Sequence, residues 1–281
     1  MKITVVKVGG AIVEDEAQLA ALLDGFSAIE GRKVLVHGGG RRATKVATTL
    51  GIESIMVGGR RVTDKAMLDV VTMVYGGLVN KNIVALMQSR GVNAIGLTGA
   101  DMDVIRSHKR LPQKPKGEIP AELADRITTA DGLVDFGYVG DVDCANGDAL
   151  SSLIESGATP IMAPLTHDGQ GNILNTNADT IASETAKALA AVKDENGNAK
   201  YDVTLIYSFE KKGVLSNPDD DDSVIPQITR PDFERYVADG TIGGGMIPKV
   251  ENALAAVDAG VNRVIITLAT AIDGLHGTVI C

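Results

Sequence analysis

Short apolar runs that end in glycine alternate along this chain with stretches whose apolar residues follow a helical spacing. The run at 3–8, ITVVKV, leads into two glycines, and the run at 33–40, KVLVHGGG, ends in three. Between them, the apolar side chains of 19–26 recur every three to four residues, as on one face of an amphipathic helix. Buried strands that alternate with helices predict an α/β fold, an αβα sandwich around a mostly parallel central sheet.

The same alternation continues along the rest of the chain. Five further apolar runs are expected strands: 93–99, 134–142, 158–165, 202–209 and 263–269. Helical patterns follow the second strand up to about residue 50 and recur at 147–157, after 175–180, near 231–239 and within 243–260. The stretch 64–89 indicates two helices that meet near Gly76-Gly77. The turn signal Asp168-Gly169 predicts a hairpin over 166–174.

A polar stretch marks the expected boundary between two lobes. Residues 193–201, KDENGNAKY, have the composition of a loop and separate a helical pattern from the apolar run that follows. A chain of 281 residues is long enough for one large domain or two modest ones. We therefore expect one lobe over 1–195 and a second over 196–281.

Composition and charge argue against several classes of partner. A net charge of −9 does not favour a surface for nucleic acid or for an anionic membrane. No apolar run has transmembrane length, and the chain starts with a strand pattern, so neither a membrane partner nor a signal peptide is expected. The two cysteines suggest no disulfide framework, which fits a reducing, cytoplasmic compartment. The four histidines lack ligand spacing, and no protein-bound metal is expected.

Three glycine clusters lie where expected strands lead into helices, at 9–10, 38–40 and 243–245. Glycine at such a junction lets backbone N–H groups approach an anion at a helix N-terminus. For any single cluster, a tight turn without a ligand is the favoured interpretation, but three clusters together favour anion binding. None matches a Walker A loop or a G-x-G-x-x-G fingerprint, so P-loop and Rossmann sites are weakly supported.

Three cations are candidates for a site: Lys7 and Lys249, each near a glycine cluster, and Arg61, which follows Gly58-Gly59-Arg60. Lys7 lies at the end of an apolar strand, where a charge is costly unless it is paired or used. Lys249 falls in the first turn of a helix, where the helix dipole disfavours a cation unless an anion lies nearby. Arg61 could hold a carboxylate in a bidentate manner. A solvated surface side chain is the alternative interpretation of each.

The stretch 175–179, NTNAD, precedes an alanine-rich helical pattern. Thr176 or Asn177 can cap the orphan N–H groups of that helix, and Asp179 near its start suits the dipole. The stretch alone is therefore explained by capping, while its polar side chains also allow chemistry.

Taken in order, KVGG (7–10), VHGGG (36–40), RVTD (61–64), NTNAD (175–179) and GGMIPK (244–249) resemble the amino acid kinase family, closest to its members that phosphorylate N-acylglutamates. The matching stretches span nearly the whole chain. The resemblance implies a two-lobed αβα sandwich, with the acceptor and a dimer contact in the N-terminal lobe and ATP in the C-terminal lobe. The partners that it implies are an acylglutamate, ATP with Mg²⁺ held through the phosphates, and a second copy of the chain in a homodimer.

The resemblance also implies roles for individual residues. Lys7 and Lys249 match the lysines that hold the transferring phosphoryl group, and Asp179 matches the aspartate that orients both. Arg61 and Asn175 match residues that anchor the acylglutamate. The matching glycines near the phosphoryl group, the acceptor and the nucleotide are Gly9, Gly10, Gly39, Gly40, Gly213, Gly244 and Gly245.

The implied activity is ATP-dependent phosphorylation of the γ-carboxylate of an N-acyl-L-glutamate, N-acetylglutamate above all, in arginine biosynthesis. N-succinylglutamate as acceptor, a glutamate 5-kinase, carbamate kinase or uridylate kinase activity, and a non-catalytic sensor remain alternatives. A γ-carboxylate with a reference pKa of about 4.3 is already ionised at pH 7 and needs no general base.

One strand departs from the family pattern. Relatives usually end it in Ser/Thr-Asp-Val, whereas this chain reads YSFEKKGVL over 207–215, with Phe209 and Glu210 in place of Asp-Val. Gly213-Val214-Leu215 does match. Arginine-inhibited relatives carry an extra N-terminal helix before the first strand, so inhibition by arginine is not expected here.

Overall fold

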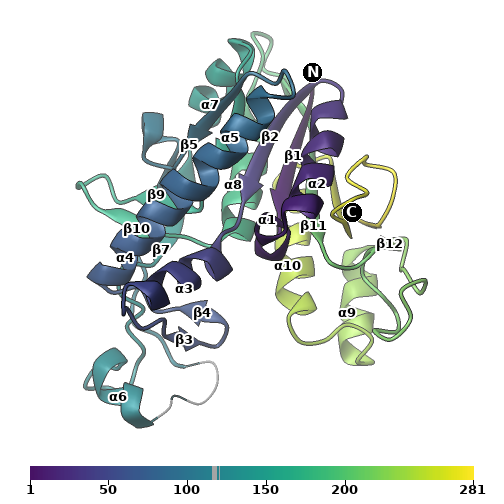
Figure 1. The fold of residues 1–281 in the computed structure, drawn as a ribbon. Coiled ribbons are helices and arrows are strands. Elements are labelled where there is room, and N and C mark those ends of the chain that lie inside the picture. Colours follow the sequence, from purple (N-terminus) through teal and green to yellow (C-terminus); the bar gives the residue numbers. More distant parts are fainter. Residues whose placement is uncertain (116–118, 120) are drawn as a thin grey trace.

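An eight-stranded sheet forms the centre of the protein (Figure 1). The structure is a computed structural model that describes residues 1–115, 119 and 121–281. Along the sheet the strands are β12 (Gln227–Ile228), β14 (Thr278–Ile280), β13 (Arg263–Leu268), β11 (Asp202–Phe209), β1 (Lys2–Val8), β2 (Arg32–His37), β8 (Thr159–Met162) and β5 (Ala94–Leu97). Every neighbouring pair is parallel except β13 and β14. The predicted mostly parallel α/β sheet is confirmed.

Helices cover both faces of the sheet, which makes the αβα sandwich (Figure 1). One apolar core lies between the sheet and α7 (Gly147–Glu155), α8 (Ala178–Ala191), α9 (Arg230–Ala238) and α10 (Met246–Asp258). The other lies under α2 (Glu16–Ala28), α3 (Gly40–Thr49) and the helix that starts at Lys65. Along β1, Val5 packs into the first core and Val6 into the second. Because side chains alternate along a strand, Lys7 faces the same side as Val5, toward α8.

The stretch 64–89 forms one continuous helix, so the prediction of two helices is wrong. It consists of α4 (Lys65–Val71), a π-helical segment η1 (Thr72–Val79) and α5 (Asn80–Gln88). Gly76 and Gly77 lie inside the π-helical segment. Buried Val74, Tyr75 and Val79 pack on the core along this segment, and such packing outweighs the low helix propensity of two glycines.

By length and composition this helix, Lys65–Gln88, is also apolar enough to cross a membrane. The expectation that no run reaches that length is therefore wrong. A core helix of a globular protein meets the same criterion, and 44% of the most apolar window of this one is buried inside the fold.

A second, four-stranded sheet lies beside the first, in the order β10 (Ile173–Asn175), β9 (Leu165–His167), β6 (Ile105–Lys109) and β7 (Gly140–Ala145). The antiparallel β9–β10 pair confirms the predicted hairpin. Two strand predictions need correction. The run 158–165 divides into β8 and the start of β9, because β9 leaves the main sheet for the second one. In 134–142 only the end is a strand, since 134–139 make isolated bridges to other segments.

Smaller elements complete the described chain: α1 (Gly10–Glu14), the hairpin of β3 (Met56–Val57) and β4 (Arg60–Arg61), the 3-10 turn η2 (Asp101–Asp103) and α6 (Ala121–Ile127). Sequence analysis missed β12 and β14, since two or three residues are too few to show a period. Residues 193–201 form the expected polar turn, with a bridge between Lys193 and Ala199. The sheet is continuous across this turn because β1 pairs with β11, and the division into lobes stays a prediction.

Candidate active site

The carboxyl ends of β1 and β2 lie side by side, and a glycine loop follows each. In the register of the pair, Lys7 is opposite Val36 and Val8 is opposite His37. The two loops touch, since a Cβ on Gly38 would lie 3.1 Å from the backbone nitrogen of Gly10. Contacts this close leave room for hydrogen but not for a methyl group. The glycines are therefore required for the two strand ends to approach each other.

Lys7, Asp179 and Lys249 come together at this end of the sheet. The Nζ of Lys7 lies 2.7 Å from Oδ1 of Asp179, and the Nζ of Lys249 lies 3.7 Å from Oδ2. All three side chains are half-buried. Burial, the largest influence, raises the pKa of Asp179, but the positive charges of Lys7 and Lys249 outweigh it and leave the pKa below its ordinary value. One carboxylate thus stays ionised between two cations.

Asp179 is the second residue of α8, and capping of that helix falls to its neighbour. The side chain of Asn177 accepts hydrogen bonds from the backbone nitrogens of Asp179 and Thr180. Within the described part of the chain, the buried Oδ1 of Asp179 has no well-aligned hydrogen bond. Its carboxylate is therefore held by charge, and the stretch 175–179 both caps a helix and carries an ion cluster.

Arg61 lies at the end of β4 beside the second glycine loop. Its Nη2 donates to the carbonyl oxygen of Gly40 and to Oγ1 of Thr44, both at 2.9 Å, and its Nη1 donates to Ser54. Among the residues the structure describes, it forms no ion pair with a carboxylate. A half-buried guanidinium fixed by neutral partners keeps its charge available to an anionic ligand.

A cavity of about 230 Å³ lies next to Arg61. Its size is below the roughly 300 to 1,000 Å³ of pockets that hold drug-sized molecules, so it suits a ligand of amino-acid size. Asn175, at the end of β10, lines the cavity. Its Nδ2 donates to Oγ1 of Thr63 at 3.0 Å, and its amide oxygen is not used in that hydrogen bond. The lining also includes Gly39, Gly40, Arg60, Tyr75, Arg110 and Ala178.

Sequence reasoning missed three of these lining residues. Arg60 stands directly before Arg61, and its position next to the RVTD motif (61–64) could have identified it as a site residue. Arg110, which pairs with Asp141 through Nε at 3.1 Å to both carboxylate oxygens, carried no signal in the sequence. The ring of Tyr75 packs against Gly39, where an added Cβ would lie 2.9 Å from the Cδ1 atom.

His37, the last residue of β2, is fully buried behind the glycine loop. Its Nδ1 lies 2.8 Å from the carbonyl oxygen of Gly38, and its Nε2 lies 3.1 Å from Nδ2 of Asn80. Burial lowers the pKa of His37 to about 4, so the ring is neutral at pH 7. It supports the loop and is not placed as a general base.

A second, largely apolar cavity of about 220 Å³ lies between the loop after β11 and the start of α10. Gly213 lines it, and a Cβ there would lie 2.7 Å from Oγ1 of Thr278. The described lining includes Gly243 but not Gly244 or Gly245, which lead from this cavity to Lys249. The acidic run 219–222 is exposed and pairs with nearby lysines, as in the 2.7 Å contact of Asp221 with Lys211.

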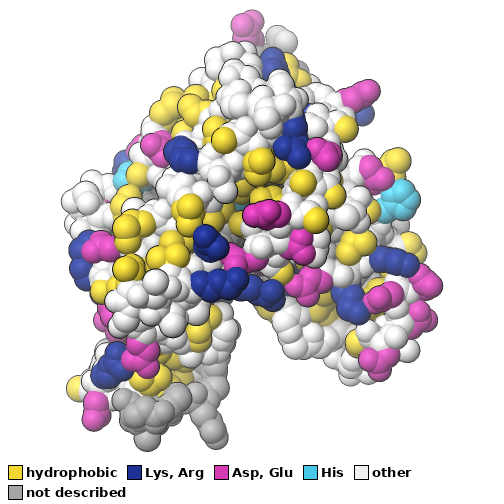
Figure 2. Space-filling view, viewed as in Figure 1, with side chains coloured by type: hydrophobic (Ala, Val, Ile, Leu, Met, Phe, Trp, Pro, Cys, Tyr) yellow, Lys and Arg dark blue, Asp and Glu magenta, His cyan; other side chains and the backbone are white. Residues whose placement is uncertain are grey.

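The surface is hollowed between the part that carries α3 and the part that carries α9, and Lys and Arg side chains gather along the rim (Figure 2). The described residues contain no group of three or more His, Cys, Asp or Glu placed to hold a metal ion. Asp and Glu side chains lie on the same rim (Figure 2), so the positive charge offered to an anionic ligand is local, from the arginine and lysines of the site.

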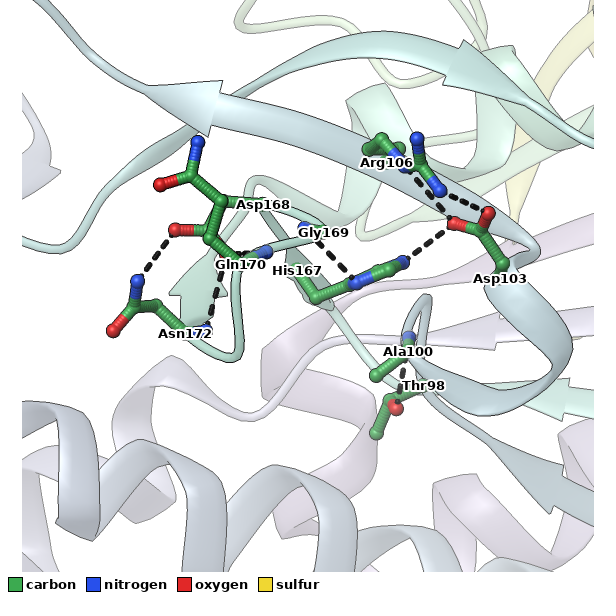
Figure 3. A network of polar contacts seen from close by, with 9 residues as sticks. All are labelled: Thr98, Ala100, Asp103, Arg106, His167, Asp168, Gly169, Gln170 and Asn172. Carbon is green, nitrogen blue, oxygen red and sulfur yellow. Dashed lines mark hydrogen bonds and ion pairs between the residues drawn. The ribbon is translucent and has the colours of Figure 1, made fainter.

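A polar network supports the hairpin that carries Asn175 (Figure 3). The Nε2 of His167 lies 2.7 Å from Oδ1 of Asp103, while its Nδ1 accepts from the backbone of Gly169 at 3.2 Å. This arrangement assigns the proton to Nε2. Arg106 also donates to Asp103. The network ties β9 to the turn before β6 and thereby steadies the hairpin that ends at Asn175.

Comparisons with known proteins agree with this arrangement. The model of the amino acid kinase family matches residues 2–268. The acetylglutamate kinase of Bacteroides thetaiotaomicron is 62% identical over 99% of this chain and 97% of its own, and that of Phocaeicola vulgatus is 60% identical over 99% and 98%. The crystal structure of smu.665 from Streptococcus mutans matches with a TM-score of 0.71 and 28% identity, covering 99% of this chain and 98% of that one. The chain belongs to the amino acid kinase family, and within it is most like the acetylglutamate kinases.

Proposed function

We propose that this protein transfers the γ-phosphoryl group of ATP to the γ-carboxylate of N-acetyl-L-glutamate, giving an acyl phosphate. The observation that carries the proposal is the ion cluster of Lys7, Asp179 and Lys249 beside an arginine-lined cavity of amino-acid size. The full-length similarity to proteins named acetylglutamate kinase supports the choice of acceptor.

The chemistry asks little more than charge and position from the protein. The acceptor carboxylate is ionised at pH 7, so no base has to remove a proton. The obstacle is repulsion between that carboxylate and the triphosphate, together with charge on the oxygens of the transferring group. Lys7 and Lys249 offset this charge, and Asp179 keeps the two ammonium groups near each other without neutralising both.

The remaining roles follow the same logic. Arg61 and Asn175 hold the acylglutamate, and the backbone of Gly39 and Gly40 lies beside it. Gly9 and Gly10 approach the phosphoryl group. At the apolar cavity, Gly213 contacts the nucleotide. Gly244 and Gly245 bind the phosphates of ATP, between this cavity and Lys249. Mg²⁺ would be held through the phosphates of ATP, whose charge it would offset.

N-succinylglutamate is a second candidate acceptor, favoured by one observation. Arg60 and Arg110 line the same cavity as Arg61, and because Arg110 is already paired with Asp141, Arg60 is the arginine left for a further carboxylate. N-acetylglutamate has one carboxylate besides the reacting one, whereas the succinyl group adds another that a further arginine can hold.

We also propose that two copies associate through the N-terminal lobe, in the cytoplasm. Met73 and Leu78, on the long helix of that lobe, are 56% and 46% exposed, and a dimer contact would cover them. Sedimentation of the wild type and of a Leu78→Glu variant tests this association.

A hydroxylamine trap tests the activity. The purified protein is incubated with MgATP and, in separate reactions, N-acetylglutamate, N-succinylglutamate, glutamate, aspartate or carbamate. Hydroxamate from an N-acylglutamate and from no other acceptor supports the proposal, and the ratio of the two acyl substrates decides the acyl group. Product from glutamate or carbamate alone assigns another activity of the family. ATP binding with no product from any acceptor makes the protein a sensor.

A further inference from the structure

Phe209 is the last residue of β11 and lies at the same sheet edge as Lys7. In the register of β1 and β11, Lys7 is opposite Tyr207, and Phe209 follows two residues later. Side chains two apart on a strand point to the same face, so Tyr207 and Phe209 both face the layer that contains α8 and α10. The half-buried ring of Phe209 accordingly packs at the edge of the core beneath those helices.

The ammonium group of Lys249 lies over this ring. Its Nζ is 5.6 Å from the centroid of Phe209. The carboxylate of Asp179 is 3.7 Å away, beyond hydrogen-bond distance, and its other oxygen is engaged at 2.7 Å by Lys7. Asp179 thus binds Lys7 more closely than Lys249, and the ring of Phe209 is, besides Asp179, the second group that holds Lys249.

The position of Lys249 explains why a second group matters. Lys249 is the fourth residue of α10, a helix whose first turn contains no acidic side chain, and the helix dipole disfavours a cation there. The face of an aromatic ring attracts a cation but carries no net charge. It can hold the ammonium group in place while leaving its charge for a phosphate.

We propose that Phe209 is a positioning residue, and that its ring holds the ammonium group of Lys249 toward the transferring phosphoryl group. The inference rests on the proposed phosphoryl transfer.

Two substitutions distinguish the effect of the aromatic ring of Phe209 from the effect of its volume. Phe209→Leu keeps an apolar side chain but removes the ring, and we expect it to lower kcat by about 3- to 10-fold. Phe209→Tyr keeps the ring and stays within about 2-fold of the wild type. Phe233→Leu is the matched control, since Phe233 is a buried ring on α9 that packs in the same core; its kcat stays near that of the wild type. Equal kcat in Phe209→Leu and the wild type would overturn the proposal.

A fluorinated series at position 209 tests the interaction with almost no change of shape. Successive fluorine atoms weaken the attraction of the ring face for a cation, so log kcat is expected to fall steadily with fluorination. A flat series would show that the ring acts only by packing.

A spectroscopic measurement makes the inference independent of activity. With ¹³Cε-labelled lysine, the ring of Phe209 shifts the Lys249 signal, which is assigned by its loss in Lys249→Arg. The signal moves toward the ordinary lysine position in Phe209→Leu and keeps its place in Phe233→Leu. An unmoved signal in Phe209→Leu contradicts the proposal. Absence of transfer by the wild type to any acceptor, with the shift present, refutes only the proposed function.

Discussion

The Nζ of Lys7 lies 2.7 Å from Oδ1 of Asp179, although Lys7 is the next-to-last residue of β1 and Asp179 is the second residue of α8, far away along the chain. Because side chains alternate along β1, Lys7 points toward α8. The cap at Asn177 fixes the first turn of α8, which carries Asp179. This pair is where the glycine loops, the acceptor cavity and Lys249 converge. Most of the proposed chemistry depends on it.

Lys7→Ala is expected to lower kcat by about 100-fold, as for removal of one donor from a charge-stabilising site. The reason is the loss of a cation beside the transferring group, and steady-state kinetics with the trapped acyl phosphate measures it. Circular dichroism checks that the variant is folded. Lys65→Ala is the control, because Lys65 forms an exposed pair with Asp69 and its loss leaves turnover unchanged. Turnover near the wild-type value in Lys7→Ala contradicts the assigned role.

Asp179→Asn is expected to lower the free energy of unfolding at pH 7 by about 2 kcal/mol, somewhat less than for a fully buried pair. The folded pKa of Asp179 is below its unfolded value of about 3.9. Its contribution is therefore present above that pH and is lost as the pH falls through the folded pKa. Denaturant titrations of both proteins should show a constant difference from pH 5 to 8 that shrinks below about pH 4. A difference that grows toward acid would be incompatible with this account.

Arg61→Lys is expected to raise KM for the N-acylglutamate by about 10-fold while KM for ATP stays unchanged. The guanidinium reaches Gly40 and Thr44 through one nitrogen and Ser54 through another, a geometry that a lysine cannot reproduce. Arg126→Lys provides the control, since Arg126 pairs with Glu53 on the surface. A rise in KM for ATP alone would move Arg61 to the nucleotide.

Gly39→Ala is expected to destabilise the fold by about 1 to 3 kcal/mol and to weaken acceptor binding. The new Cβ would lie 2.9 Å from Cδ1 of the Tyr75 ring, so either the ring or the loop has to move. Gly77→Ala, inside the long helix with open space around it, should instead stabilise by up to about 1 kcal/mol. Thermal unfolding of both variants tests the pair, and equal shifts in the same direction would contradict the steric account.

Arg60→Gln is expected to lower kcat/KM for N-succinylglutamate by about 10-fold and to leave N-acetylglutamate nearly unchanged. Arg60 lines the cavity, and its charge matters only for an acceptor with an additional carboxylate. Competition between the two acceptors in one reaction measures the ratio directly. An equal loss with both would assign Arg60 to the carboxylate that they share.

The fold was largely predictable because its strands carry strong local patterns. β1, β2, β5 and β11 are short apolar runs bounded by glycine or polar residues, and the structure confirms them. The long helix was predicted as two, because Gly76 and Gly77 break the local pattern while the core contacts that override it come from distant segments. The strand β14 was missed because its three residues are stabilised by pairing with β13, which no local signal records.

The sequence by itself determined which residues are available: glycines at the strand ends, two lysines, an aspartate behind an asparagine cap, and an arginine after Gly58-Gly59. Only the tertiary structure decided which of them meet. The approach of Lys7 and Lys249 to Asp179, the ring of Phe209 under Lys249, and Arg110 in the cavity all depend on contacts between distant segments. Local propensity and periodicity act over a few residues, whereas these distances are set by how parallel strands order themselves in a sheet and how helices pack across it.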